Sequence, residues 1–303
     1  MINDIAFVPP KNVPQAECRR LFHGRGKAYP GYQHVNIDWL PPVALIMLYE
    51  PVDTKWLAEL ADTLMSRIDG CRSVQVQHRY QEKSPTEVLL GEALTEIVVT
   101  EDGLKFYIQL GRLQNYGLFL DMRNGRRWVR EQAADKRVLN LFAYTCAFSV
   151  AALAGGARKV VNFDNNKSVL QRGRENHRLN NQDTAHVVFE GVDIFRSWSR
   201  LRKHGPYDLL ICDPPAFQVG SVNIGKDYQK IIRRLPEFMA PGGLLVLCLN
   251  APNLDQNFLH EIVSAECDVC RYTEIIPLPE AYKETVSGQG TKVSVFEYRP
   301  DQA

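Results

Sequence analysis

The spacing of hydrophobic residues in the first third of the chain predicts a small mixed α/β domain. From 53 to 68, apolar side chains recur every three or four positions, which predicts an amphipathic helix. Short strand-like segments follow at 74–78 and 87–91, and two more, 96–100 and 105–110, flank a Glu-Asp-Gly turn typical of a hairpin. The first 50 or so residues are rich in proline and glycine and give no clear pattern.

A different pattern begins after residue 115, where short apolar runs alternate with helical segments. The runs are 138–142, 159–163, 187–190, 209–212 and 244–249, and helices are expected at 149–154 and 167–180. This alternation predicts a parallel sheet with helices on both faces. We therefore expect two domains, at 1–110 and 111–303. Ligands of such sheets bind beyond the carboxyl ends of the strands, so the residues after each strand are the candidates for chemistry.

Composition narrows the class of protein. The 303 residues carry 36 basic and 35 acidic side chains, so no overall field attracts nucleic acid, although local patches could do so. Seven scattered cysteines do not form a disulfide framework, and the CxxC at Cys267 and Cys270 has no second pair at zinc spacing, so no metal is expected. With no signal pattern and no membrane-length apolar run, the expected location is the cytoplasm. The oligomeric state has no signature in the sequence.

The first three strand ends carry candidate ligands for a nucleoside. The loop 143–147 lacks GxGxxG, which disfavours a dinucleotide site, but its small residues allow a tight turn. Asp164 ends the second run, and its two carboxylate oxygens could accept from both ribose hydroxyls. The alternative is that it caps the next helix. Asp193 follows the third run and could accept from an adenine amino group, or be an exposed turn residue.

The fourth run leads directly into Asp213, two prolines, Ala216 and Phe217, the most informative segment of the chain. The sequence places a carboxylate and a rigid turn at the edge of the sheet. Because proline has no N–H, the carbonyl of Pro214 could accept from a substrate amine. Phe217 could stack on a planar base. The alternative is a rigid loop with a buried phenylalanine.

These motifs resemble those of class I S-adenosylmethionine (SAM)-dependent methyltransferases and, more narrowly, of the bacterial large-subunit ribosomal-RNA methyltransferases. The matching segments are 116–123, 140–145, 155–157 and 213–217, within a similarity that covers about 75–265. The resemblance implies a Rossmann-like, doubly wound, mostly parallel seven-stranded sheet with a smaller N-terminal α/β domain. SAM is the implied cofactor.

The resemblance also implies roles for individual residues. Tyr144 and Thr145 would line the cofactor loop, Asp164 would hold the ribose, Asp193 the adenine, and Asp213 the edge of the transfer site. Phe119, Asp121 and Arg123 would close over the methionine end, and Asn140 and Asn165 are further candidate cofactor-binding residues. The chain departs from the family pattern at Cys146 and Ala147, where glycine is common, which makes the loop less permissive. A separate N-terminal RNA-binding module, frequent in ribosomal members, is not recognisable in 1–70.

The residues favour a nitrogen atom of an RNA base as the methyl acceptor. A neutral amine needs no strong base before it attacks, so Asp213 and the Pro214 carbonyl would suffice. Methylation of a ring carbon needs a thiolate that first activates the base. In the members of the family that make 5-methylcytosine, a cysteine follows the fifth run. The corresponding residue here is Asn250, with Cys248 two positions earlier inside the strand.

Two basic clusters are the candidates for contact with RNA phosphates. Arg19, Arg20, Arg25 and Lys27 surround His23, and Arg123, Arg126, Arg127 and Arg130 form the other group. Solvated surface charge is the alternative for both. A small-molecule or protein methyltransferase is a second interpretation, which the near-zero net charge favours. A non-catalytic SAM-binding or RNA-binding protein is a third, against which the intact motif at 213–215 argues.

Overall fold

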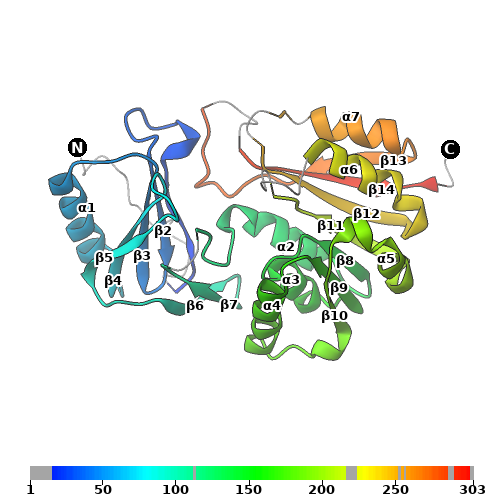
Figure 1. Ribbon diagram of the computed structural model, residues 1–303, viewed down its shortest axis with the longest axis horizontal. Helices are drawn as coiled ribbons and strands as arrows, with labels where there is room; N and C mark the ends of the chain where they lie inside the picture. Colours follow the sequence, from blue (N-terminus) through cyan, green and yellow to red (C-terminus); the bar gives the residue numbers. More distant parts are fainter. Residues whose placement is uncertain are drawn as a thin grey trace. The chain divides into compact units, whose positions relative to one another are not determined.

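The computed structural model describes residues 16–111, 114–215, 224–251, 254–255, 257–285 and 290–300. The chain forms two compact units (Figure 1). The first consists of Met1–Asp121 and Pro279–Val286, and the second of Met122–Leu278 and Ser287–Ala303. The first change of unit therefore lies at 121/122, whereas the sequence pattern placed it at 110/111. The return of 279–286 to the first unit has no sequence signature.

The first unit contains a five-stranded sheet and one long helix. The strands are β1 (Arg19–His23), β2 (Val35–Leu40), β3 (Val43–Leu48), β4 (Ser73–His78) and β5 (Thr86–Gly91), in that order across the sheet. Only β3 and β4 pair in parallel, because α1 (Thr54–Arg67) crosses over between them. The carboxylate of Asp53 accepts from the Trp56 N–H at 2.9 Å and caps this helix. The predicted helix at 53–68 is thus confirmed.

The two faces of this sheet differ in chemistry. One face is apolar and packs against Leu57, Leu60 and Leu64 of α1. The other face carries polar side chains that are nevertheless buried: Asn36, Asp38, Gln75 and Gln77. A separate hairpin follows, formed by β6 (Glu96–Glu101) and β7 (Leu104–Gln109), with the predicted turn at residues 102 and 103 between them. The strands β1 to β3 were not predicted.

The second unit is built on a seven-stranded sheet of order β10-β9-β8-β11-β12-β14-β13. Its strands are β8 (Arg137–Leu141), β9 (Lys159–Asp164), β10 (Val187–Gly191), β11 (Tyr207–Cys212), β12 (Met239–Leu249), β13 (Cys270–Ile275) and β14 (Lys292–Tyr298). The first five strands of that order pair in parallel, and β14 is antiparallel to both of its neighbours. The prediction of a mostly parallel seven-stranded sheet is confirmed.

Helices cover both faces of this sheet, as the alternating pattern predicted. The helices are α2 (Arg123–Gln132), α3 (Ala147–Ala154), α4 (Lys167–Leu179), α5 (Trp198–His204), α6 (Ile224–Arg233) and α7 (Asn257–Glu266). Side chains of α2 and α3 pack in one core cluster with Val138 and Ile211, whereas those of α5, α6 and α7 pack in another with Leu139 and Leu210. The arrangement is doubly wound, and Figure 1 shows α2 and α3 together on one face.

Candidate functional site

The loops after β8, β9 and β10 lie at one edge of the seven-stranded sheet. Because β8, β9 and β10 are parallel, their carboxyl ends meet there; Leu141 pairs with Phe163, and Asp164 pairs with Gly191. Asp164 is the last residue of β9, and Asp193 follows β10 by two residues. The structure therefore brings these two predicted ligands to adjacent strand ends.

The loop after β8 has an unusual backbone. Phe142, Tyr144 and Cys146 all have positive φ, at 58°, 48° and 61°, a conformation that favours glycine. Such residues persist only where the surrounding structure holds them. Two hydrogen bonds to β9 supply part of that hold: Ala143 N–H donates to the Phe163 carbonyl at 3.0 Å, and Tyr144 N–H donates to Asp164 Oδ2 at 2.9 Å.

Cys146 occupies the position directly before α3, where the resemblance led us to expect glycine. Its side chain is fully buried and packs with Ala143 and Leu170. Gly173 on α4 makes room for it, because a Cβ at that position would lie 2.8 Å from the Cys146 Cβ and closer still to its Sγ. Burial raises the pKa of Cys146, so the thiol is inert.

The carboxylate of Asp164 is fixed at this edge of the sheet by two backbone N–H groups. Oδ2 accepts from Tyr144 N–H, and Oδ1 accepts from Asn166 N–H at 2.8 Å. Each oxygen keeps a second acceptor direction. Burial raises the pKa of Asp164, and the N–H groups of Asn166 and Tyr144 oppose that rise. The alternative that Asp164 caps α4 is wrong, because Asn166 does so by accepting from the N–H groups of Ser168 and Val169. Asn165 is exposed beside it.

Asp193 is more exposed and caps a single turn. Its Oδ1 accepts from Phe195 N–H at 2.8 Å, and its Oδ2 lies 3.6 Å from Arg196 Nε. The Phe195 ring lies with its centroid 6.4 Å from that of Phe142 at the end of β8. Neither phenylalanine was predicted as a site residue. Their only signal in the sequence is position, at the last residue of an apolar run or two residues after Asp193.

Asn140 belongs to a chain of neutral hydrogen bonds inside the second unit. Its Nδ2 donates to Asn162 Oδ1 at 2.9 Å. The next links join Asn162 to Ser149 at 3.0 Å, Ser149 to His177 at 2.9 Å and His177 to Gln182 at 2.6 Å. This chain connects β8 and β9 with α3 and α4, the helices that follow the two loops. Asn140 is buried, and its amide nitrogen donates to Asn162 rather than to a ligand.

The end of β11 carries the remaining predicted residues. Asp213 is half-buried and Pro214 is buried, directly after Cys212. The Tyr228 hydroxyl, from α6, lies within hydrogen-bond distance of the carbonyls of Cys212 and Cys248, and so ties the ends of β11 and β12 together. Asn250 is exposed after β12, and Lys292 Nζ donates to the Ala251 carbonyl at 3.1 Å. Phe217 lies outside the described residues.

The motif containing Phe119, Asp121 and Arg123 spans the change of unit. Phe119 is 39% exposed and belongs to the first unit with Asp121, whereas Arg123 begins α2 of the second unit. Their closure over the methionine end stays a prediction.

The basic clusters are only partly at the surface. Arg20 forms an ion pair with Asp38, with 9% and 0% of the two side chains exposed. Arg126 is 4% exposed, and its guanidinium lies 5.9 Å from the Phe148 ring. Phosphate contact and solvated surface charge, the two interpretations of these clusters, both need exposed side chains, and neither fits the buried Arg20 and Arg126.

Two further features of the described part of the chain concern metals and membranes. Cys267 and Cys270 are buried free thiols, and no group of three or more potential metal ligands occurs among the described residues. None of the described helices has the length and apolar character needed to cross a membrane.

With the fold and this edge established, similarity to known proteins becomes informative. The sequence profile of the S-adenosylmethionine-dependent methyltransferases matches residues 19–297, so the chain belongs to this family. The cofactor of the family is SAM, as the motifs implied.

Individual relatives narrow the similarity. The ribosomal RNA large subunit methyltransferase I of Aeromonas salmonicida is 32% identical, over 68% of this chain and 53% of its own length. The corresponding methyltransferase K of Neisseria meningitidis is 32% identical, over 70% and 61%. The chain thus spans little more than half the length of these curated relatives. A solved SAM-dependent methyltransferase from Streptococcus mutans superposes with a TM-score of 0.84 at 26% identity, over 94% of this chain and 76% of that one.

Proposed function

We propose that the chain binds SAM at the carboxyl ends of β8, β9 and β10 and transfers its methyl group to a nitrogen of an RNA base. The observation that carries the cofactor site is the carboxylate of Asp164, which two backbone N–H groups hold at the strand edge. Free acceptor directions on both oxygens suit a pair of ribose hydroxyls. A solved methyltransferase of similar fold, with TM-score 0.84, is described as a complex with S-adenosylhomocysteine (SAH).

The residues around Asp164 would complete this cofactor site. Asn165 is exposed beside Asp164, and the loop of Tyr144 and Thr145 follows the end of β8. Asp193 would accept from the adenine amino group, and the rings of Phe142 and Phe195 offer apolar surface for the base. Phe119, Asp121 and Arg123 would close over the methionine end of the cofactor. Asn140 contributes by fixing β8 to β9 through Asn162.

The acceptor would bind beside Asp213. The bound cofactor supplies the electrophilic methyl group, and the protein aligns the attacking nitrogen with it. Asp213 and the carbonyl of Pro214 would accept hydrogen bonds from the amine, which orients its lone pair, and Phe217 would stack on the base. Among the described thiols, Cys146, Cys212 and Cys248 are fully buried, which disfavours the covalent route to a ring carbon. The names of the ribosomal-RNA methyltransferase relatives support RNA as the substrate class.

Replacement of Asp164 tests the cofactor site. Asp164→Ala should weaken SAM binding by about 1.5–3 kcal/mol, or roughly 10- to 150-fold, because charge-assisted hydrogen bonds are lost. Calorimetry with SAM and SAH measures this. Asp183→Ala is the matched control, since the Asp183 carboxylate likewise accepts from a backbone N–H, at 2.9 Å from Ala185, but stands before β10 rather than after a strand. Equal losses in both variants would contradict the proposal.

Replacement of Asp213 tests the transfer site. Asp213→Ala should keep cofactor affinity near that of the wild type while it lowers turnover. The assay is transfer of labelled methyl groups to RNA from cells that lack this protein, with protein and metabolite extracts in parallel. Label in either of those extracts and none in RNA would replace the RNA proposal with the second interpretation. Equal loss of affinity and turnover would assign Asp213 to the cofactor pocket.

A further inference from the structure

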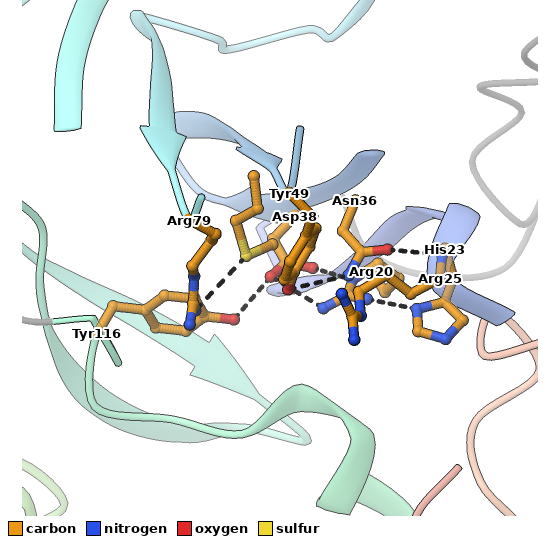
Figure 2. A network of polar contacts seen from close by, with 9 residues as sticks. Arg20, His23, Arg25, Asn36, Asp38, Tyr49, Arg79 and Tyr116 are labelled. Atoms are coloured by element: carbon orange, nitrogen blue, oxygen red, sulfur yellow. Dashed lines mark hydrogen bonds and ion pairs between the residues drawn. The ribbon is translucent and has the colours of Figure 1, made fainter. Parts of the chain in front are cut away.

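The buried polar face of the five-stranded sheet ends in a group of basic and aromatic side chains. In the sheet register Asn36 pairs with Met47, and Met47 pairs with Gln77, so these three share one face. Side chains alternate along a strand, which places Tyr49 and Arg79 next on that same face. Arg79 N–H donates to the Leu48 carbonyl at 2.7 Å and continues the parallel pairing of β3 and β4. Figure 2 shows Asn36, Tyr49 and Arg79 from close by.

The charge of Arg20 on this face is already balanced. Asp38 forms an ion pair with it and also accepts from the Tyr116 hydroxyl at 2.8 Å. A further Arg20 N–H group donates to His23 Nδ1 at 2.6 Å. Arg20 therefore already has a buried counterion, which makes it a poorer site for an external anion than a guanidinium without one.

Arg25 and Arg79 are in a different state. Within the described residues, neither guanidinium has a carboxylate within 4.0 Å. The Arg25 guanidinium stacks 4.1 Å from the centroid of the Tyr49 ring. Among the described residues, Arg79 donates from its side chain to the Met47 sulfur at 3.9 Å, which is a weak acceptor, and the Arg79 Nε is buried without a partner. A buried charged donor without an acceptor costs free energy, and a bound anion that accepts its hydrogen bond would remove that cost.

Asn36 links the two sides of this group. Its Oδ1 accepts from Arg25 N–H at 3.4 Å, and its Nδ2 donates to the Tyr49 hydroxyl at 3.5 Å. These contacts orient the ring on which Arg25 stacks. Tyr80, next to Arg79 in sequence, is 39% exposed. Two guanidinium groups without counterions beside aromatic rings match a ligand that carries both phosphates and planar bases.

We propose that Arg25, Tyr49 and Arg79 form a phosphate-binding site for the backbone of the RNA that accepts the methyl group. The inference rests on the proposed function. In this site the Arg79 guanidinium donates hydrogen bonds to a phosphate oxygen. Arg25, stacked on the Tyr49 ring, contacts the same or the neighbouring phosphodiester. An acidic peptide would be bound by charge alone, whereas the exposed Tyr80 also offers a stacking surface for a base.

The salt dependence of RNA binding tests this site. Fluorescence anisotropy with labelled single-stranded ribosomal-RNA fragments, at several salt concentrations, compares wild type with Arg25→Gln, Arg79→Gln and the double variant. Each lost phosphate contact should lower the slope of log K against log[salt] by about 0.7, so the double variant should lose about 1.4. Lys55→Gln is the matched control, because Lys55 is exposed on α1, which covers the opposite face. It should leave the slope unchanged.

Two checks separate this inference from the proposed function. SAM affinity and the unfolding midpoint confirm that each variant is folded, and Arg25→Gln alone, at an exposed residue, gives the test if Arg79 variants fail to fold. A wild type that methylates RNA, with an unchanged slope in the folded variants, would overturn the phosphate site alone. Wild type that binds RNA with the expected slope but transfers no methyl group would support the site and overturn the proposed function.

Discussion

The two units bury polar side chains in opposite ways. In the first unit, the Arg20 cluster (Arg20, His23, Asp38, Tyr116 and Tyr282) gathers around a single carboxylate. In the second, the Asn140 chain (Asn140, Asn162, Ser149, His177 and Gln182) contains no charged group, and each donor meets one acceptor in sequence. The first group depends on a charge balance, whereas the second depends on the direction of its hydrogen bonds.

This difference has consequences for stability and for the cofactor loop. Burial and the charge of Asp38 both raise the pKa of Tyr116, so its hydroxyl stays protonated and donates. Loss of the one anion would leave Arg20 buried without compensation, and such a loss is expensive. In the neutral chain, Gln182 also donates to the Val150 carbonyl at 2.9 Å, which fixes its amide and makes His177 the donor at Nδ1. Loss of a residue from this neutral chain would disturb the orientation of its hydrogen bonds but would leave no buried charge without a partner.

Replacement of Asp38 should produce the largest effect. Asp38→Asn removes the anion and turns one acceptor into a donor that faces Arg20 and Tyr116. We expect a loss of about 3–5 kcal/mol in the free energy of unfolding, measured by urea denaturation. Glu92→Gln is the control, because it breaks the surface ion pair with Arg72 and should change stability little. A similar small change for Asp38→Asn would show that the charge balance does not hold the cluster.

Acid should destabilise both regions through their neutral histidines. Burial, with the charges of Arg20 and Arg25, lowers the pKa of His23 to about 3, and burial lowers the pKa of His177 to about 4 against the opposing hydrogen bond with Gln182. Between these values and the unfolded pKa of about 6.5, the unfolded chain binds more protons, so stability falls as the pH drops through that window.

The size of this acid effect gives a direct comparison of the two regions. From pH 7.5 to 5, each histidine should account for about 2 kcal/mol of lost stability. His23→Asn and His177→Asn should each flatten the curve of stability against pH, whatever they cost at pH 7.5. Denaturation at a series of pH values measures the slopes. A slope unchanged in one variant would mean that its histidine titrates normally in the folded protein.

Crowding the cofactor loop from α4 should have a moderate effect confined to the second unit. Gly173→Ala places a methyl group against Cys146, and we expect a cost of about 1–3 kcal/mol together with weaker SAM binding. Cys146→Ala in the same chain should restore part of both losses, because it removes the sulfur but not the Cβ. Calorimetry and denaturation measure the two effects. A Gly173→Ala variant that is destabilised but binds SAM with unchanged affinity would show that the loop around Cys146 does not contribute to the cofactor site.

The sequence predicted the second unit better than the first for a physical reason. Five of the seven strands in its sheet contain short apolar runs. Asp164 and Asp213 follow such runs directly and Asp193 follows one within three residues, so the alternation of apolar runs and helices located both the fold and the edge. In the first unit, one apolar run folds as the hairpin of β2 and β3 around Pro41 and Pro42, which broke the pattern.

Other features of both units depend on long-range contacts and left no local signal. Asp38 is 18 residues from Arg20 in the chain, so the ion pair could not be inferred from the basic cluster alone. The positive φ values of Phe142, Tyr144 and Cys146 occur without any glycine to mark them. The return of 279–286 to the first unit brings Tyr282 to within 4.8 Å of the Arg20 guanidinium, another contact that no periodicity encodes.

The smallest effect is expected at Cys248, the cysteine closest in the chain to the position used for covalent methylation. Its side chain is fully buried inside β12, where Cys248 pairs with Val293 of β14, and its carbonyl lies within hydrogen-bond distance of Tyr228. A thiol enclosed between strands and helices cannot approach a base. Asn250, two residues later and exposed, can hydrogen-bond a base through its amide but cannot attack it.

Trapping with fluorinated RNA distinguishes the two routes. Cysteine-dependent methylation of a ring carbon forms an enzyme–base adduct, and a fluorine at carbon 5 prevents its breakdown because it cannot leave as a proton does. We expect no denaturation-resistant adduct between wild type and 5-fluoropyrimidine RNA on electrophoresis, and retention of methyl transfer in Cys248→Ala, since the thiol takes no part in the reaction. Cys212→Ala is the companion variant, because that thiol is also fully buried and burial raises its pKa. An adduct that disappears on Cys248→Ala would move the acceptor from nitrogen to carbon and identify 5-methylcytosine as the product.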